Sequence, residues 1–362
     1  MRLPTLQVKG ASRPVILLQG GMGAGISLSQ LAGAVARRGG VGTVSFVALD
    51  KMVSDRIGRI ISHHEAAKIE VEEARRLSDN LGAIAINCMV LIDKTYVASI
   101  EGAIEGGVDI IIAGAGLPMT LPEIVGNHPV ALVPIVSSGR ALELICKRWH
   151  RTGRTPDAVV VEGPKAGGHL GFKSEDIPKP EFQLENIFGP VKEVAQKHGN
   201  FPVIVAGGIY SREDIVYWVD VMGADGVQLG TRFAATEESG ASESFKRAIV
   251  AAKEEDLVVA TNPGSPSGMP FRVIGFSPGY QQALAKTRKP LCDQQYLLHP
   301  GKDGKLTCRA LEGFDAFCIC NTLLCAAGKE ASALPIYTVG TNAYRIDRIL
   351  PVNELIDELT GQ

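Results

Sequence analysis

The chain has 362 residues, of which 45% are hydrophobic and 21% charged, a balance typical of globular rather than disordered or fibrous proteins. Its formal net charge of −2 argues against a nucleic-acid or anionic-membrane partner, because either would favour a basic surface. Seven cysteines, an odd number in a long chain, favour reduced thiols over a disulfide framework.

No apolar run reaches the length needed to cross a bilayer. The stretch Met1–Gly10 lacks the charged-then-apolar pattern of a secretory signal. We therefore expect a cytoplasmic protein with small-molecule partners and with neither a nucleic-acid nor a membrane partner. The sequence does not determine the oligomeric state, and a homodimer is compatible with it.

Short apolar runs bounded by Gly, Pro or Asn recur along the first two thirds of the chain. They are Val15–Leu18, Gly42–Phe46, Ile84–Ile86, Asp109–Ala113, Ala131–Val136, Ala158–Val161, Pro202–Ala206 and Gly226–Leu229. Near-continuous apolar runs of this kind are typical of strands buried on both faces of a parallel sheet.

Amphipathic stretches alternate with these runs and predict helices. They are Ser27–Arg38, Glu65–Asn80, Lys94–Glu105, Arg140–His150, Phe188–Lys197 and Arg212–Met222. Because strands and helices alternate, the predicted class is α/β.

The number of strands favours a closed (β/α)8 TIM barrel over an open doubly wound sheet. One observation favours the open sheet. The glycines of Gly20–Gly25 follow the first strand and precede a helix, as in a dinucleotide-binding fingerprint. The G-x-G-x-x-G spacing is not met cleanly, however, and no acidic residue closes the second strand unless Asp50 does so. We therefore predict the barrel.

We divide the chain into three predicted segments. Residues 1–260 form the barrel, residues 261–335 form a lid or insertion segment over its mouth, and residues 336–362 pack back on the barrel. The middle segment is long and has no clear periodicity, and such a stretch is usually functional rather than a mere linker.

That middle segment contains most of the cysteines: Cys292, Cys308, Cys318, Cys320 and Cys325. Their spacing fits neither a paired C-x-x-C zinc pattern nor a ferredoxin run. Buried free thiols are the default interpretation, so we predict no metal site. The sequence leaves open whether these residues bind a metal or an iron–sulfur cluster.

In a barrel of this type the active site lies at the carboxyl ends of the strands. Unusual residues of this chain gather at those ends: Gln19–Gly23, Asn87, Glu162–Gly163, Gly207–Gly208 and Gln228–Thr231. Glycines at the last two ends would let backbone N–H groups approach an anion, with a helix N-terminus behind them. We therefore expect a phosphate group at these two loops.

His169 is the candidate for proton chemistry. It follows Gly167 and Gly168 in a loop just beyond the sixth predicted strand, where a flexible backbone would set its ring beside a ligand. An imidazole can remove a proton near neutral pH. From position alone, catalysis and simple packing explain this histidine equally well.

Several stretches carry a resemblance to a known family. They are PVILLQGGMGAGIS, AIAIN, AGAGLPMTLPEI, VEGPKAGGHLG, PVIVAGGIYS and GADGVQLGTRF, followed by FCICNTLLCAAGKE and VGTNAYRIDRIL. From about Pro14 to Leu350, the chain resembles the nitronate monooxygenase family (formerly 2-nitropropane dioxygenases), which also contains flavin-dependent enoyl-acyl carrier protein reductases.

The resemblance implies that the barrel of residues 1–260 binds one FMN non-covalently and that His169 is the catalytic residue. The cofactor-binding residues that it implies are Gly21, Met22, Gly23, Asn87, Glu162, Gly167, Gly168, Gly207, Gly208, Gln228, Leu229, Gly230 and Thr231. This chain departs from many relatives in having Glu162 in place of Gln and Lys165 in place of Glu.

The activity implied first is oxidation of alkyl nitronates with O2 to carbonyl compounds and nitrite. Two alternatives stay open: an NAD(P)H-dependent enoyl-acyl carrier protein reductase using FMN, and a flavin-binding module of a lipid or polyketide synthase system. The physiological substrate, the use of NAD(P)H and the effect of Glu162 and Lys165 on specificity are also open.

Overall fold

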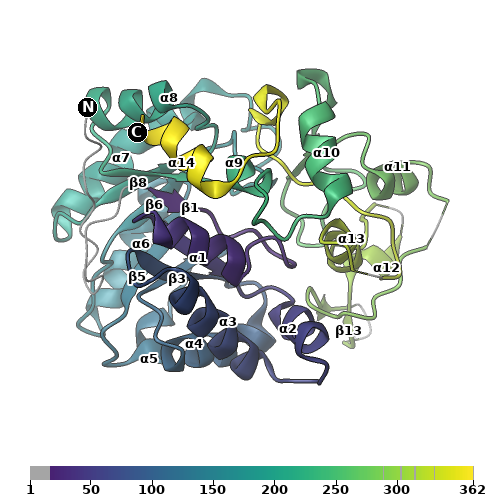
Figure 1. The fold of residues 1–362 in the computed structure, drawn as a ribbon, viewed down its shortest axis with the longest axis horizontal. Helices are drawn as coiled ribbons and strands as arrows, with labels where there is room; N and C mark the ends of the chain where they lie inside the picture. Colours follow the sequence, from purple (N-terminus) through teal and green to yellow (C-terminus); the bar gives the residue numbers. More distant parts are fainter. Residues whose placement is uncertain (1–16, 288, 302–303, 314, 330, 362) are drawn as a thin grey trace.

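The computed structural model describes residues 17–361 except 288, 302–303, 314 and 330. Its centre is a closed barrel of parallel strands in the order β1-β2-β3-β4-β5-β6-β8-β9 (Figure 1). The barrel strands are β1 (Leu18–Gln19), β2 (Val41–Ser45), β3 (Ala83–Met89), β4 (Ile110–Gly114), β5 (Ala131–Val136), β6 (Val159–Glu162), β8 (Val203–Ala206) and β9 (Gly226–Leu229). The predicted (β/α)8 barrel is confirmed, although Val15 and the residue after it lie outside the described residues.

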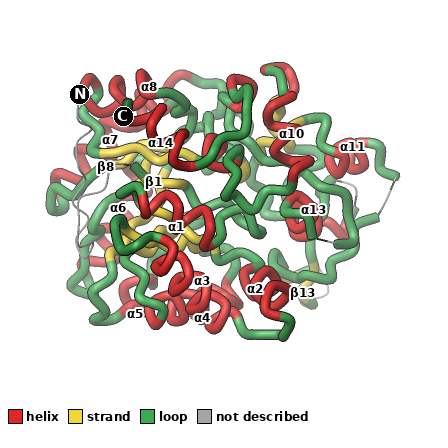
Figure 2. The backbone as a smooth tube through the Cα atoms, viewed as in Figure 1, coloured by secondary structure: helices red, strands yellow, loops and turns green. Residues whose placement is uncertain are grey.

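Burial on both faces explains why the strands appear as continuous apolar runs. Alternate residues such as Ala85, Ile112 and Val160 pack together inside the barrel. Their neighbours, such as Ile84 and Ile111, face outward into a second core shared with the helices. Figure 2 shows these strands enclosed by helices.

The helices around the barrel largely follow the predicted ones. The predicted positions are occupied by α1 (Ser29–Arg37), α3 (His63–Leu77), α4 (Asp93–Glu105), α6 (Gly139–His150), α7 (Leu184–Lys197) and α8 (Arg212–Val216). The remaining helices are α2 (Leu49–Ile57), α5 (Leu121–Val125), α9 (Thr231–Ala234), α10 (Glu243–Ala251), α11 (Pro278–Leu284), α12 (Arg309–Glu312), α13 (Ile319–Ala326) and α14 (Val352–Thr360).

The helix predicted over Arg212–Met222 is divided in the structure. Its first part is α8, and Tyr217–Val221 then forms a π-helical turn. Here the N–H of Met222 donates to the carbonyl of Tyr217, so the turn contains one residue more than an α-helical turn. A spacing of apolar residues does not distinguish these two turns, which is why the prediction missed the change.

A small antiparallel sheet lies outside the barrel and was not predicted. It pairs β10 (Leu257–Ala260) with β11 (Phe271–Ile274) and β11 with β7 (Gly168–His169). A separate hairpin pairs β12 (His299–Pro300) with β13 (Leu306–Thr307). The pairing of β7 with β11 connects the loop after β6 to a segment about a hundred residues later in the chain.

Helix α14 brings the end of the described chain back to the barrel. Its buried side chains Val352, Leu355, Ile356 and Leu359 join the large core between the strands and the surrounding helices. Figure 1 shows α14 in yellow beside α1, while α11, α12 and α13 lie to one side of the barrel. Within the described residues, no helix is long and apolar enough to span a membrane.

Candidate active site

A cavity of about 280 Å³ opens at the carboxyl ends of the barrel strands, and we call it the strand-end cavity. Its wall brings together every residue that the sequence singled out for catalysis or cofactor binding. These residues are Gly21, Met22, Gly23, Asn87, Glu162, Gly167, Gly168, His169, Gly207, Gly208, Gln228, Leu229, Gly230 and Thr231.

Other residues of the wall were missed by the sequence analysis. Phe271, Leu323 and Ala326, from the segment predicted to be a lid, line the cavity, and so does Phe245 of α10. The division of the chain into three segments itself stays a prediction. Another part of the wall consists of Thr338, Gly340, Thr341, Asn342, Ala343 and Ile346. The stretch VGTNAYRIDRIL was the available signal for that part, but no site residue was chosen from it.

The turn after β1 is held against β3. A Cβ atom added to Gly21 would lie 2.2 Å from Cβ of Asn87, so only glycine fits beside that asparagine. Two buried side chains support the turn from behind. Gln19 Nε2 donates to Ser27 Oγ (2.9 Å), and that hydroxyl oxygen accepts from the backbone N–H of Met22 (2.9 Å).

The glycine pair after β8 has a backbone conformation that other residues rarely adopt. Gly207 has φ +93° and Gly208 has φ +87°, both in the left-handed region that favours glycine. A Cβ atom added to Gly208 would lie 2.9 Å from Cβ of Lys165, so the lysine side chain runs directly past this glycine.

Free backbone donors point to anion binding at the loops after β8 and β9. Among the residues that the structure describes, the N–H groups of Gly207, Gly208, Gly230 and Thr231 have no hydrogen-bond acceptor. Helix α9 behind them is only four residues long, so its dipole adds little to the N–H groups. These donors, rather than a long helix, are the feature suited to a phosphate.

Residues near the end of the chain hold these loops in place. The N–H of Gly340 donates to Thr231 Oγ1 (2.9 Å), and Asn342 Nδ2 donates to the carbonyl of Gly208 (2.5 Å). The N–H of Thr341 donates to the carbonyl of Lys165 (3.1 Å).

His169 lies in the wall with its ring held on two sides. Its Nε2 is 2.9 Å from Ser265 Oγ, and the ring packs edge-on against Phe271 with centroids 4.7 Å apart. Burial disfavours the charged imidazolium and lowers the pKa of His169 to about 4. The ring is therefore neutral at physiological pH.

Two other polar groups of the wall lack partners. Burial raises the pKa of Glu162 to about 7, and its carboxyl group has no hydrogen bond or ion pair within the described part of the chain. The side-chain oxygen of Gln228 is buried and also has no hydrogen-bond donor there. Unsatisfied groups of this kind in a cavity wall are suited to a polar ligand.

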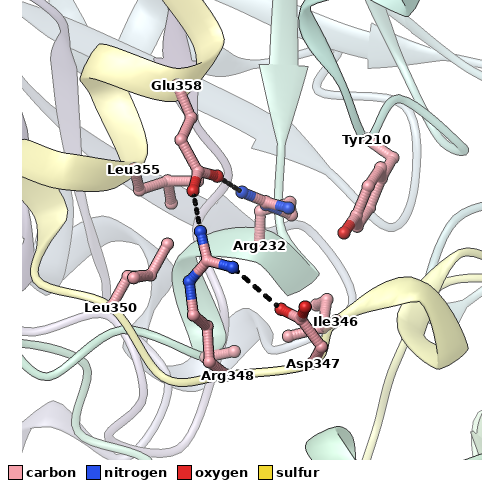
Figure 3. Close-up of a pocket in the computed structure, with 9 residues that line it drawn as sticks. Tyr210, Arg232, Ile346, Asp347, Arg348, Leu350, Leu355 and Glu358 are labelled. Atoms are coloured by element: carbon pink, nitrogen blue, oxygen red, sulfur yellow. Dashed lines mark hydrogen bonds and ion pairs between the residues drawn. The ribbon is translucent and has the colours of Figure 1, made fainter.

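A second, smaller cavity of about 110 Å³ adjoins the first and shares Tyr210, Arg232 and Ile346 with it (Figure 3). Arg232 forms an ion pair with Glu358 of α14 (2.7 Å), and Arg348 pairs with the same carboxylate. The charges that line this cavity thus satisfy one another. We interpret it as a gap in the packing between α9 and α14 rather than as a binding site.

The cysteines of the predicted lid are free thiols in the structure. Burial raises the pKa of Cys308 and of Cys320 to about 12. Across the described ranges, no group of three or more His, Cys, Asp or Glu side chains is arranged to hold a metal ion.

The closed barrel and a cavity at its strand ends define a (β/α)8-barrel protein with its candidate site at the usual position for this fold. The family model for nitronate monooxygenase matches residues 7–362, and the chain therefore belongs to the nitronate monooxygenase family.

The chain is also similar to individual curated proteins and solved structures. A probable nitronate monooxygenase of Staphylococcus saprophyticus is 43% identical over 105 residues, a match that spans 28% of this chain and 28% of that protein. FabK from Thermotoga maritima has a TM-score of 0.68 at 24% identity, covering 98% of this chain and 92% of its own. Nitroalkane oxidase from Streptomyces ansochromogenes also has a TM-score of 0.68, at 20% identity, covering 96% of this chain and 95% of its own. At these identities the two structures show a shared fold.

Proposed function

We propose that the chain is an FMN-dependent oxidoreductase that oxidises alkyl nitronates with O2, giving a carbonyl compound and nitrite. The observation that carries the proposal is the strand-end cavity, whose single wall contains His169 and every residue implied for FMN. Membership of the nitronate monooxygenase family supports the same activity.

The cavity wall fits a flavin nucleotide. At Gly21 and Gly167 the wall is bare backbone, and an added Cβ would collide with neighbouring atoms at both positions. The unpaired oxygen of Gln228 offers a polar contact for the ring system. The free N–H groups of the glycines after β8 and β9 would hold the phosphate.

When bound, the flavin supplies two-electron redox chemistry between the substrate and O2. The protein's part is to bind and orient the substrate and to control its proton. Because the imidazole of His169 is neutral, it places no charge beside the substrate, and one of its ring nitrogens carries no proton and can accept one. Its low pKa makes it a weak base toward a neutral nitroalkane, whereas a pre-ionised nitronate needs no base. Phe271 packs against the ring and helps to fix its orientation.

The decisive experiment measures the absorbance spectrum of the purified protein and then its oxygen consumption with a small alkyl nitronate. We expect a yellow protein that consumes O2 and forms nitrite, and a loss of most of this activity in His169→Asn. Flavin-loaded protein that consumes no oxygen with the nitronate would contradict the proposal. Rapid bleaching by NADH or NADPH, followed by reoxidation with an enoyl thioester, would assign the chain to the enoyl reductases instead. Unchanged function in His169→Ala would favour a binding module.

A further inference from the structure

His169 is contacted by a serine that comes from far along the chain. Ser265 Oγ lies 2.9 Å from His169 Nε2, and Ser265 is only 3% exposed. The backbone holds this serine firmly, because its neighbour Gly264 donates to the carbonyl of Asp315 (2.8 Å) and accepts from the N–H of Phe317 (3.1 Å).

A second serine continues the hydrogen bonds away from the ring. Ser265 Oγ lies 2.9 Å from Ser267 Oγ and accepts from the N–H of Ser267 (3.3 Å). Ser267 Oγ in turn accepts from the N–H of Met269 (3.2 Å). Ser265 is buried and Ser267 is half-buried, so the two hydroxyls lead from the ring toward solvent.

The other ring nitrogen of His169 is left for a ligand. Within the described part of the chain, Nδ1 has no hydrogen-bond partner, while the ring as a whole lines the strand-end cavity. Ser265 does not line that cavity, so Nε2 points away from it and Nδ1 is the nitrogen available to a substrate.

We propose that Ser265 and Ser267 relay a proton between Nε2 of His169 and solvent during deprotonation of a neutral substrate. As the substrate C–H bond breaks, its proton bonds to Nδ1 and the electron pair stays on the substrate as the nitronate. The proton on Nε2 passes to Ser265 Oγ, the hydroxyl proton of Ser265 passes to Ser267 Oγ, and the hydroxyl proton of Ser267 passes to water. The imidazole is neutral before and after, so the buried ring never has to remain a cation.

The relay extends the proposed function and rests on it, because it lets a weak base accept neutral nitroalkanes as well as nitronates. Burial disfavours the imidazolium, so His169 accepts the substrate proton more readily if the proton on Nε2 can leave at the same time. Ser265 and Ser267 act through His169 and are positioning residues, not catalytic ones.

The test compares a nitroalkane with its own nitronate in Ser265→Ala. We expect kcat with the neutral nitroalkane to fall about tenfold or more and kcat with the nitronate to stay within about twofold. Ser265→Thr, which keeps the hydroxyl, should restore most of the loss. Ser267→Ala should give a smaller fall with the nitroalkane alone. An equal fall with both substrates, or no fall with either, would overturn the relay.

Ser244→Ala is the matched control. Ser244 is an exposed serine of α10 that also contacts another serine hydroxyl, Ser242 Oγ at 3.0 Å, and it does not line the strand-end cavity. We expect both kcat values of this variant to equal those of the unmodified protein.

A readout without turnover separates the relay from the proposed function. In 15N-histidine-labelled holoprotein, with the signal of His169 assigned from His169→Asn, we expect the neutral tautomer that carries its proton on Nε2. Ser265→Ala should shift this tautomer balance. An unchanged tautomer would overturn the relay even if the nitronate is oxidised. If the unmodified protein oxidises no nitronate, the proposed function fails while the tautomer result still decides the relay.

Discussion

Gly21 packs closely against Asn87 where the turn after β1 meets β3. A methyl group on Gly21 would lie 2.2 Å from Cβ of Asn87, whereas one on the exposed Gly189 of α7 would meet no atom within 4 Å outside its own helix backbone. We therefore expect Gly21→Ala to move the turn away from the cavity, costing about 1–3 kcal/mol of stability and most of the bound flavin. Gly189→Ala is the control and should keep its flavin, because Gly189 does not line the cavity. Flavin content is measured by absorbance of the two purified variants. Equal contents would mean that the close contact of Gly21 with Asn87 does not shape the flavin site.

Glu162 makes the stability of the flavin-free protein depend on pH. Its pKa is raised from 4.5 to about 7, so the folded protein holds this proton more tightly than the unfolded chain does. The free energy of unfolding therefore falls as pH rises from about 4.5 through 7. Glu162→Gln removes this loss, and should gain about 2–3 kcal/mol above pH 7 and almost nothing at about pH 4.

Urea unfolding, carried out above pH 7 and at about pH 4, measures whether Glu162→Gln raises the free energy of unfolding only at the higher pH. The exposed Glu175 supplies the control, since Glu175→Gln should change stability little at either pH. A gain for Glu162→Gln of the same size at both pH values would mean that its ionisation is not the cause.

Among the elements, β11 connects the cavity to the segment beyond the barrel. Its buried Arg272 donates from Nη1 to the carbonyl of Pro164 (2.7 Å) and to the carbonyl of Ala166, just before the glycines that precede His169. Arg272→Met leaves both carbonyls without these donors, and should cost about 2–4 kcal/mol. The loss should appear in thermal unfolding together with reduced flavin content. Arg247→Met, at an exposed position of α10, should leave both unchanged; similar losses in the two variants would contradict this role.

The elements also show what a sequence can and cannot predict. Strands β5 and β9 have the predicted bounds, because burial on both faces leaves a continuous apolar run. The strand-end glycines were predictable because a barrel places its active site there. The contact of Ser265 with His169 was not, since it joins residues 96 positions apart and a serine in a loop has no periodic signal. Asn342, which donates to the carbonyl of Gly208, lies in the stretch VGTNAYRIDRIL, which carried the family resemblance but did not indicate a role for this single residue.

On the scale of the whole molecule, α14 fastens the end of the described chain to the barrel. Ile356 is 1% exposed and packs in the main core, so Ile356→Ala should lower the free energy of unfolding by about 2–5 kcal/mol. Glu354 is exposed on the same helix, and Glu354→Ala should cost less than about 1 kcal/mol. Chemical denaturation measures both. A small loss for Ile356→Ala would mean that α14 is not part of the cooperative unit.

The wall of the strand-end cavity contains residues from near the start of the described chain, Gly20–Gly23, and from its last part, Thr338 and Gly340–Ala343. Gly340 and Asn342 bond to the loops after β9 and β8. A ribosome builds the chain from its N-terminus, so every barrel strand has been synthesised before these two residues exist. A nascent chain that stalls after β9 therefore has all eight barrel strands but an incomplete wall. Enclosure of a ligand in this cavity consequently has to wait until residues well beyond the last barrel strand have been synthesised.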